Sequence, residues 1–281
     1  MNAIRLWVDG QLVGPDVPSV RALDHGLTVG DGAFETCKVV DGEAFALTRH
    51  LRRLGRTLAG LGLPPVDDAW VSQGVKEVLS SGEPIGFGRV RITVTGGAGP
   101  LGSDRHDSPA TVIVAATPSA AHAPSAAVVT VPWVRNERAA TVGLKTTSYA
   151  ENVIAVTYAR SHGAEEALLA NTRGELCEGT ASNVFVVTDG VLRTPPLDSG
   201  CLAGITRELA IEWCREAGLE VVEEAMPFEV LSTADEVIIT NSSRDVQGVH
   251  LVDDRQLAVG PVTARMVEIW RTAEADLGMD P

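Results

Sequence analysis

Residues 175–217, ELCEGTASNVFVVTDGVLRTPPLDSGCLAGITRELAIEWCREA, pass from the residue pattern of strands to that of a helix. Three short apolar runs bounded by turn-forming residues predict strands at 176–177, 183–188 and 191–194. After the loop 199–204, Leu209, Trp213 and Ala217 recur at helical spacing, which predicts a helix over 205–217 that Gly218 ends. Strands and helices mixed within one stretch are typical of an α+β fold.

The same mixture extends outward over the rest of the chain. Apolar runs between turn signals predict further strands at 4–8, 11–13, 33–40, 43–47, 89–95, 111–116, 127–132, 167–170 and 236–240. Helical spacing predicts helices at 48–61, 68–79, 151–161 and 261–275. Thr48 is the expected N-cap of the first of these helices, and its arginine-rich face, which includes Arg53, is expected to be solvated.

The chain is long enough for one large domain or two modest ones, since it has 281 residues and domains average roughly 150. Residues 115–127, AATPSAAHAPSAA, lose both periodicities and are rich in alanine, proline and serine, as linkers are. We therefore expect a small N-terminal domain at 1–117, an interdomain linker at 118–127 and a large domain at 128–281.

The composition narrows the classes of function. The formal net charge of −14 argues against a nucleic-acid partner, because neutralising phosphates requires a basic face. No apolar stretch approaches the roughly 20 residues that cross a bilayer, and MNAIRLWVDG lacks the basic-then-apolar order of a signal peptide. A cytoplasmic protein with no membrane partner is the expectation.

Two familiar patterns in the sequence do not predict the binding sites with which they are usually associated. Residues 97–102, GAGPLG, fit the dinucleotide-binding pattern, but the turn-forming run that follows predicts no helix there. Asp104, His106 and Asp107 in that run are better explained as a solvated loop than as metal ligands. The four cysteines, scattered without a CxxC pair, predict neither a disulfide framework nor a zinc site, so no metal is expected.

Chemistry that needs a primary amine has three candidates, because only Lys38, Lys76 and Lys145 are lysine. Lys76 falls in a helix among polar neighbours and is expected in solvent. Lys145 stands between apolar and small hydroxylic residues, where partial burial would make its amine nucleophilic, although an ordinary interfacial lysine fits the same pattern. Glu178, between two predicted strands, either pairs with an arginine or holds a cationic ligand atom.

Two loops offer anion-binding donors. The loop 199–204 leads into a helix whose first amides, at Ile205 and Thr206, form an anion site together with the Thr206 hydroxyl. A second small polar loop, which contains Ser242 and Ser243, ends a predicted strand and offers further donors. An amine, a carboxylate and an anion cradle together are what pyridoxal 5′-phosphate requires.

The chain also resembles the class IV, or fold type IV, pyridoxal-phosphate aminotransferases over nearly its whole length. The matching elements are DHG at 24–26, VGDGAFE at 29–35, HLRRL at 50–54, Lys145, EGTASNVF at 178–185, GITR at 204–207 and PVT at 261–263. The resemblance implies an α+β protein of two domains, with a smaller N-terminal α/β sandwich and a larger C-terminal pseudo-barrel that binds the cofactor. Family members are at least homodimers, so a homodimer is implied too.

The resemblance implies roles for individual residues. Lys145 would form the aldimine with the cofactor, and Glu178 would keep the pyridine nitrogen protonated. Arg53, with the Ile205 and Thr206 amides and Ser242 or Ser243, would bind the phosphate. Tyr149, with a one-residue gap, matches the tyrosine that contacts the phenolic oxygen in branched-chain aminotransferases.

The reaction is less constrained than the cofactor. Residues 34–39, FETCKV, look most like D-amino acid transaminases, although those enzymes have a tyrosine where this chain has Phe34. They also place an arginine after Thr95 to bind the substrate carboxylate, and this chain does not, which leaves Lys38, Arg135 and Arg138 as candidates. We therefore expect a ping-pong transamination between an amino acid, D-amino acids favoured, and a 2-oxo acid.

Other activities stay open at this stage. The segment 96–105 and the loop 132–138 are broadly like those of 4-amino-4-deoxychorismate lyases, and a branched-chain L-amino acid aminotransferase would need the same cofactor residues. Outside this chemistry, a nucleotide-binding oxidoreductase using residues 97–102, or a ligand-binding protein without turnover, would fit the chain less well.

Overall fold

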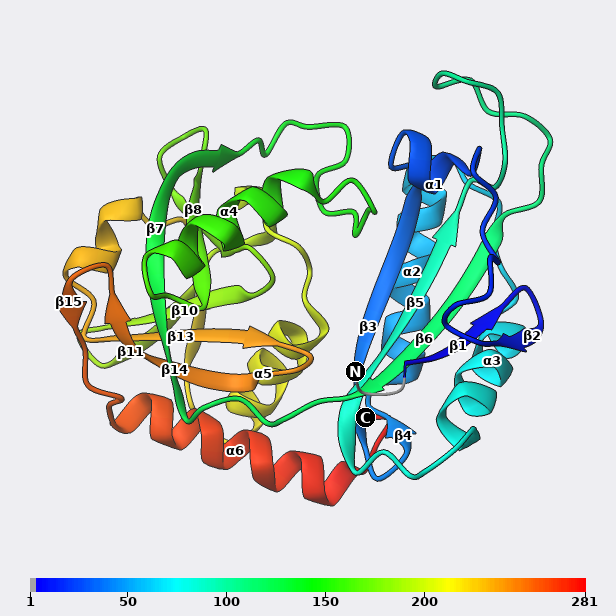
Figure 1. Ribbon diagram of the computed structural model, residues 1–281. Helices are drawn as coiled ribbons and strands as arrows, with labels where there is room; N and C mark the ends of the chain where they lie inside the picture. The colour runs from blue at the N-terminus through cyan, green and yellow to red at the C-terminus, as the bar shows by residue number, and fades with distance from the viewer. Residues whose placement is uncertain (1–3) are drawn as a thin grey trace. The chain divides into compact units, whose positions relative to one another are not determined.

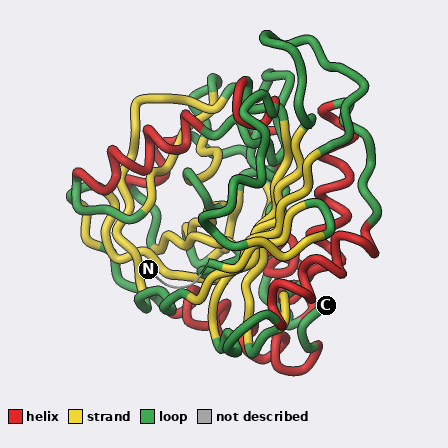
Figure 2. Tube along the Cα trace, turned by 45° about the vertical axis from the view of Figure 1, so that its right-hand side comes forward, coloured by secondary structure: helices red, strands yellow, loops and turns green. Residues whose placement is uncertain are grey.

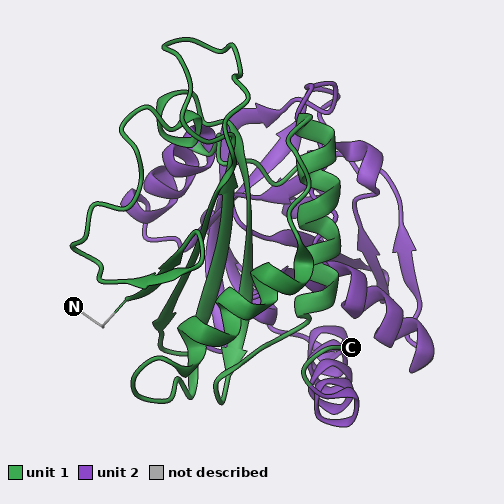
Figure 3. Ribbon diagram, turned by 90° about the vertical axis from the view of Figure 1, so that its right-hand side faces the viewer, with its two compact units in different colours: residues 1–121, 144–149, 279–281 green, residues 122–143, 150–278 purple. Residues whose placement is uncertain are grey.

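The computed structural model describes residues 4–281, which form two compact units. Unit 1 comprises residues 1–121, 144–149 and 279–281, and unit 2 comprises residues 122–143 and 150–278 (Figure 3). No helix of the described residues is long and apolar enough to cross a membrane.

Unit 1 is built on a six-stranded antiparallel sheet in the order β2-β1-β6-β5-β3-β4 (Figure 1). Its strands are β1 (Arg5–Val8), β2 (Gln11–Val13), β3 (Gly32–Val40), β4 (Glu43–Ala44), β5 (Phe87–Thr95) and β6 (Thr111–Pro118). The short helix α1 (His25–Thr28) precedes β3, and α2 (Leu47–Leu61) and α3 (Asp68–Ser80) lie over one face of the sheet, as Figure 3 shows. Apolar side chains of that face and of both helices form the core of the unit.

The other face of this sheet carries polar and aromatic side chains, because alternate residues of a strand point to opposite faces. Along β3, Ala33, Cys37 and Val39 join the core beneath α2 and α3, so Phe34 and Lys38 lie on the opposite face. The same alternation places Val90, Ile92 and Val94 of β5 in the core and its arginines on the opposite face. This second face of β3 and β5 is called the open face below.

Unit 2 is built on a nine-stranded mixed sheet in the order β12-β11-β10-β13-β14-β7-β8-β9, with β15 paired to β14. Both sheets curl, and Figure 2 shows their strands in yellow. The strands are β7 (Ser125–Arg135), β8 (Glu166–Asn171), β9 (Leu176–Gly179), β10 (Asn183–Thr188), β11 (Val191–Thr194), β12 (Val221–Glu223), β13 (Glu236–Asn241), β14 (Asp245–Val252) and β15 (Arg255–Gln256). The helices are α4 (Ala150–Ser161), α5 (Ile205–Glu216) and α6 (Pro261–Leu277), with the 3-10 turns η1 (Leu197–Ser199) and η2 (Phe228–Ser232).

The expected elements lie close to those observed, with specific exceptions. Thr48 does not cap α2, which begins at Leu47 after Ala46 in the left-handed region at φ 54°. The polar groups of Thr48 instead meet Asp280, whose carboxylate accepts from the Thr48 amide at 2.9 Å and from its hydroxyl at 2.5 Å. A partner 232 residues away therefore replaces the local cap. Arg53 is not solvated either, since only 4% of it is exposed.

The division of the chain also differs from the expected boundaries. The units separate between residues 121 and 122, but β6 extends to Pro118 and β7 already begins at Ser125. Unlike the expected continuous domain at 128–281, residues 144–149 and 279–281 belong to unit 1. The segment that carries Lys145 is therefore positioned by the N-terminal sheet, although it lies far along the chain.

Candidate cofactor and substrate site

Lys145 lies beside strand β3 of unit 1, held by backbone hydrogen bonds on both sides. The Phe34 amide donates to the Lys145 carbonyl at 3.0 Å, and the Lys145 amide donates to Thr57 Oγ1 at 3.3 Å. Two residues later, the Thr147 amide donates to the Gly32 carbonyl at 2.8 Å. These bonds fix the backbone of the half-buried lysine against the sheet and α2.

Two aromatic side chains lie beside the Lys145 amine on the open face. Its Nζ lies 4.5 Å from the ring centroid of Phe34 and 6.0 Å from that of Tyr149. The two rings pack edge to face, with centroids 5.2 Å apart at an interplanar angle of 87°. Arg91 Cζ lies 3.7 Å from the Phe34 centroid, within the range of a cation–π interaction. Phe34, Lys145, Tyr149 and Arg91 therefore form one cluster.

Arg91 is a candidate that the sequence analysis missed. Burial lowers the pKa of its guanidinium and the nearby Tyr149 raises it, but an arginine stays charged at neutral pH. The strand register pairs Arg91 with Thr36, two residues along β3 from Phe34. The sequence shows arginines at alternate positions of β5. It does not show which residues of β3 lie opposite them, because that depends on the register of the two strands.

Lys38 is not a surface charge. Its side chain lies on the open face with only 2% of the residue exposed, and its Nζ stands 4.8 Å from the ring centroid of Phe45. Lys76, in contrast, is exposed on α3 as expected. Of the three lysines, Lys145 alone lies within the aromatic cluster.

Arg53 belongs to a buried polar network on the core face of the same strand. Its Nε donates to Glu35 Oε1 at 2.8 Å and its Nη2 to Glu35 Oε2 at 2.6 Å. His50 Nδ1 lies 2.7 Å from the same Oε2. Burial alone would raise the pKa of Glu35, but the charge and hydrogen bonds of Arg53, assisted by His50, lower it to about 2. Burial lowers the pKa of His50, so its ring is neutral at neutral pH.

In unit 2, Glu178 is paired with an arginine, one of the two possibilities that its sequence context left open. Arg135 Nε donates to Glu178 Oε1 at 3.0 Å, and the Leu202 amide donates to Oε2 at 2.9 Å. A carboxylate has about four acceptor positions, so a further donor can bind Glu178 without breaking either bond. Arg135 is committed to this pair and is a poor candidate for a substrate cation.

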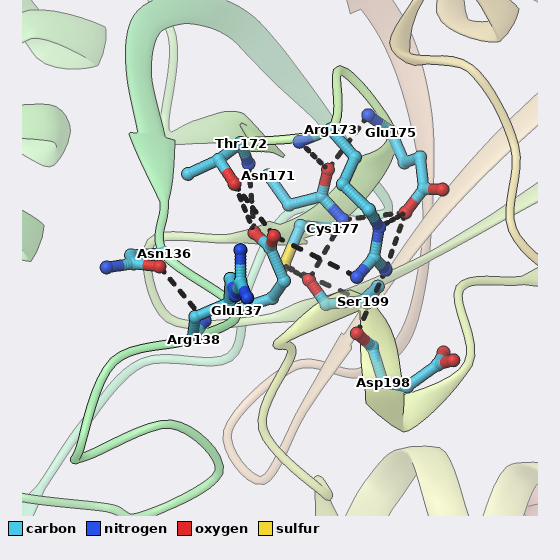
Figure 4. Close-up of polar contacts among 10 residues, drawn as sticks. All are labelled: Asn136, Glu137, Arg138, Asn171, Thr172, Arg173, Glu175, Cys177, Asp198 and Ser199. Carbon is cyan, nitrogen blue, oxygen red and sulfur yellow. Dashed lines mark hydrogen bonds and ion pairs between the residues drawn. The ribbon is translucent and has the colours of Figure 1, made fainter.

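The loop between η1 and α5 is fixed by polar groups on its N-terminal side. The Ser199 carbonyl accepts from Asn171 Nδ2 at 3.1 Å and from Cys177 Sγ at 3.4 Å. Figure 4 shows these contacts in a larger network, in which Glu137 accepts hydrogen bonds from the amide and hydroxyl of Thr172. In the same network, Arg173 binds Glu175 and the Asp198 carbonyl (Figure 4). These hydrogen bonds hold the N-terminal side of the loop in unit 2.

The start of α5 is suited to an anion. Its N-cap, Gly204, provides no side-chain cap, and among residues 4–281 the backbone hydrogen bonds outside helices and strands include none from the Ile205 and Thr206 amides. Both residues are buried, and buried amides are normally paired. A phosphate at this helix N-terminus would satisfy them, so these residues fit the phosphorylated cofactor that the sequence suggested.

Ser242 and Ser243 lie in the turn that joins β13 to β14. Asn241 Oδ1 organises this turn by accepting from the Ser243 amide and hydroxyl, each at 3.0 Å, and from the Arg244 amide at 2.9 Å. The Ser243 hydroxyl thus already has an acceptor. Arg138, the remaining substrate candidate, is exposed, and its amide donates to Asn136 Oδ1 at 2.9 Å.

The patterns set aside in the sequence behave as ordinary structure. No helix follows residues 97–102, so the dinucleotide pattern lacks the helix it requires. No group of three or more potential metal ligands occurs within residues 4–281. The four cysteines are buried and free, and burial raises the pKa of Cys201 and of Cys214 to about 11.

The chain is similar to known proteins over most of its length. The model of the amino-transferase class IV family matches residues 32–252. A putative branched-chain-amino-acid aminotransferase of Methanocaldococcus jannaschii is 31% identical, covering 98% of each chain. A D-alanine aminotransferase of Staphylococcus haemolyticus is 29% identical over 94% of this chain and 95% of its own. The branched-chain aminotransferase of Thermoproteus uzoniensis, solved with norvaline, superposes with a TM-score of 0.88 at 29% identity, covering 95% of this chain and 93% of its own.

Proposed function

Because the chain belongs to the class IV aminotransferase family, we propose that it transfers amino groups between D-amino acids and 2-oxo acids. It is a pyridoxal-phosphate-dependent aminotransferase, as this family membership establishes. The preference for D-amino acids and the role of each residue are the parts proposed here. The observation that carries the residue assignment is the Lys145 amine beside the Phe34 and Tyr149 rings.

When bound, pyridoxal 5′-phosphate supplies an electron sink for the electrons of a broken bond at the substrate Cα. We assign its aldehyde to Lys145 and its ring nitrogen to Glu178. The Ile205 and Thr206 amides, whose acceptors are otherwise missing, bind the phosphate in this proposal. Tyr149 binds the phenolic oxygen.

Arg53, Ser242 and Ser243 are proposed as further phosphate donors. The Arg53 guanidinium, which Glu35 orients through bonds to Nε and Nη2, is one of these proposed donors. Ser242 lies in the turn after β13. The Ser243 hydroxyl donates to Asn241 Oδ1, so it would have to give up that bond before it could donate to the phosphate. This set is to be tested one residue at a time by cofactor affinity.

Lys145 also serves as the proton carrier. With the cofactor bound, the Lys145 amine would accept the proton from the substrate Cα and later release it, acting as general base and then as general acid. The Phe34 and Tyr149 rings lie beside this amine, and an apolar surrounding favours the neutral form that accepts a proton. Glu178 holds a proton at the ring nitrogen, since a carboxylate there favours the charged ring.

Arg91 is the proposed partner of the substrate carboxylate. Arg91 is an exposed cation of the open face, and its Cζ and the Lys145 amine lie 3.7 Å and 4.5 Å from the centroid of the same Phe34 ring. A substrate carboxylate can pair with such a guanidinium. Lys38 is almost fully buried and Arg135 is paired with Glu178, which makes them weaker candidates. Arg138 is exposed and stays a candidate only for a contact outside this cluster.

The D-amino acid preference rests on the sequence of β3 and on the D-alanine aminotransferase relative at 29% identity. A branched-chain L-amino acid aminotransferase is the second candidate, because the Methanocaldococcus jannaschii relative, at 31% identity, carries that name. Aminodeoxychorismate cleavage is the third reaction to be tested. Residues shared by the cofactor site are equally compatible with all three.

A homodimer is also proposed. Trp133 and Val134 at the end of β7, and Val153 and Ile154 on α4, are exposed large apolar side chains of unit 2. Exposed apolar side chains of this size can be buried at an interface, and a second copy of the chain is the proposed partner. Size-exclusion chromatography with light scattering is expected to give twice the mass of one chain, and Val153→Asp with Ile154→Asp to give the monomer.

The substrate proposal is tested by single half-reactions. Purified holoenzyme is mixed with D-alanine, L-leucine or aminodeoxychorismate, and the visible cofactor absorption is followed. Rapid loss of that absorption with D-alanine and formation of pyruvate support the proposal. If the absorption is lost with L-leucine and not with D-alanine, the branched-chain assignment replaces the D-amino acid proposal. If aminodeoxychorismate yields pyruvate without a second substrate, the lyase assignment replaces it.

A further inference from the structure

Arg135 reaches Glu178 across an intervening strand. Arg135 is the last residue of β7 and pairs in register with Asn171 on β8, whereas Glu178 lies on β9 opposite Leu169. The side chains are largely buried, with 17% of Arg135 and 12% of Glu178 exposed. Such a pair fixes both side chains, because separating either partner would leave a charge poorly solvated.

Asn152 of α4 holds the other edge of the Arg135 guanidinium. Its Oδ1 accepts from Arg135 Nη1 at 3.2 Å, and its Nδ2 donates to the Thr180 carbonyl. Only this orientation of the amide places its acceptor toward the cation and its donor toward the carbonyl. Arg135 is thus oriented by α4 and, through Asn152, linked to the turn directly after Glu178.

Glu178 in turn connects this network to the loop that leads into α5. Its second oxygen, Oε2, accepts the Leu202 amide at 2.9 Å, three residues before Ile205. The Leu202 carbonyl accepts from Asn183 Nδ2 at 2.8 Å, so the loop is held on both sides. A displacement of the Glu178 carboxylate would therefore also move the segment that presents the Ile205 and Thr206 amides.

From these contacts we infer that Arg135 is a positioning residue for Glu178, and that it sets cofactor affinity rather than binding the substrate carboxylate. This inference rests on the proposed function, in which Glu178 faces the ring nitrogen. The guanidinium of Arg135 donates to Glu178 Oε1 and to Asn152 Oδ1 at the same time, because its forked donors point in fixed, diverging directions. A lysine offers no such fork and cannot reproduce both bonds in this geometry.

The test compares Arg135→Gln and Arg135→Lys with the wild type by titrating each apoenzyme with pyridoxal phosphate. The dissociation constant is expected to rise about tenfold or more for Arg135→Gln, and less for Arg135→Lys, which retains the charge. At saturating cofactor, KM for the amino acid is expected to change less than about threefold. Arg265→Gln is the matched control, because it removes the same charge from an exposed ion pair with Glu268 on α6.

A double-mutant cycle identifies the route of the effect. If Arg135 acts through Glu178, Arg135→Gln adds little to the loss of affinity that Glu178→Gln already causes. Circular dichroism and Tm of each apoenzyme separate this from unfolding, and Arg135→Lys keeps the test informative if Arg135→Gln fails to fold. An unchanged cofactor dissociation constant in both Arg135 variants, or fully additive losses in the cycle, would overturn the inference.

Failure of the proposed function itself gives a different result. In that case, borohydride reduction of the wild-type protein would attach no pyridoxyl phosphate to Lys145, and the titrations would show no specific binding to compare. The Arg135 inference fails alone when the wild type is labelled at Lys145 and the Arg135 variants bind the cofactor as tightly.

Discussion

Glu35 and Arg53 form a two-point ion pair in the interior of unit 1, with Arg53 Nε 2.8 Å from Oε1 and Arg53 Nη2 2.6 Å from Oε2 of Glu35. Neither side chain is more than 5% exposed, and His50 contacts the same carboxylate at 2.7 Å. Breaking such a pair costs far more than an exposed one, because the remaining charge stays buried. The pair thus stabilises unit 1 and orients Arg53 at once.

The first prediction compares two buried glutamates. Glu35→Gln would set an amide N–H against donors of Arg53 or His50 and is expected to lower the free energy of unfolding by about 3–5 kcal/mol. Glu166→Gln is the matched control, because Glu166 is as buried, its burial raises its pKa, and its Oε1 accepts from the Thr180 hydroxyl and the Ala181 amide. A glutamine oxygen can keep both bonds, so a change below about 1 kcal/mol is expected. Urea unfolding at pH 7 measures both, and equal losses would contradict this account of Glu35.

Acid should weaken unit 1 through the same carboxylate. The pKa of Glu35 is about 2 in the folded protein against an ordinary 4.5, so its contribution is complete above pH 4.5 and is lost as the pH falls toward 2. At about 1.36 kcal/mol per pH unit, the full contribution is on the order of 3 kcal/mol. The stability difference between wild type and Glu35→Gln is therefore expected to shrink by about 2 kcal/mol between pH 7 and pH 3. A difference that stays constant over this range would show that Glu35 is not ionised in the folded protein.

Arg91 and Arg89 provide a test of substrate binding on the open face. Arg91→Gln is expected to raise KM for the amino acid and the 2-oxo acid by about tenfold to a hundredfold, because a charge-assisted hydrogen bond is lost. The cofactor dissociation constant should not change. Arg89→Gln removes the same charge two residues away on the same strand and opposite Lys38, and no change in KM is expected from it. Steady-state kinetics measures KM for both variants. An equal rise in KM would show that substrate binding depends on the total charge of the open face and not on Arg91 itself.

Gly204 should tolerate no side chain. A Cβ on Gly204 would lie 2.0 Å from Asn183 Oδ1, so alanine must displace the side chain that holds the Leu202 carbonyl. Gly204→Ala is expected to cost about 1–3 kcal/mol and to weaken cofactor binding. The control is Gly55→Ala on the exposed side of α2, where a Cβ meets nothing within 4 Å and a gain of about 0.5–1 kcal/mol is expected. Thermal unfolding and cofactor titration measure both variants, and tight binding by Gly204→Ala would argue against a rigid loop.

Strands and helices with clear periodicity were predictable from the sequence, and those held by distant partners were not. The helix around Leu51 and Leu58 and the strand around Phe34 lie where the apolar spacing placed them. Strand β14 (Asp245–Val252) was missed, because Gln247, Gly248 and His250 interrupt its alternation. The cap expected at Thr48 failed because Asp280, at the other end of the chain, takes both of its donors.

The candidate site shows the same division. Lys145 and Glu178 were predicted as site residues because a charged residue is unusual in their surroundings, and the local sequence is enough to show this. The ion pair of Glu178 with Arg135 joins two strands that are not neighbours in the sheet, and the cluster of Phe34 with Arg91 depends on the register of β3 and β5. Neither relationship is expressed in residue spacing. The Glu35 network was partly readable, since Glu35 alternates with buried Cys37 and must find a cation there.

The central claim is that the Lys145 amine binds the cofactor covalently, and one measurement addresses it directly. The purified holoenzyme is reduced with borohydride, digested, and its peptides are sequenced by mass spectrometry. With only Lys38, Lys76 and Lys145 in the chain, the label has three possible lysine positions. The account predicts a phosphopyridoxyl group on Lys145 and on neither of the others. A label on Lys38 or Lys76, or none on a protein shown to be folded and supplied with the cofactor, would contradict it.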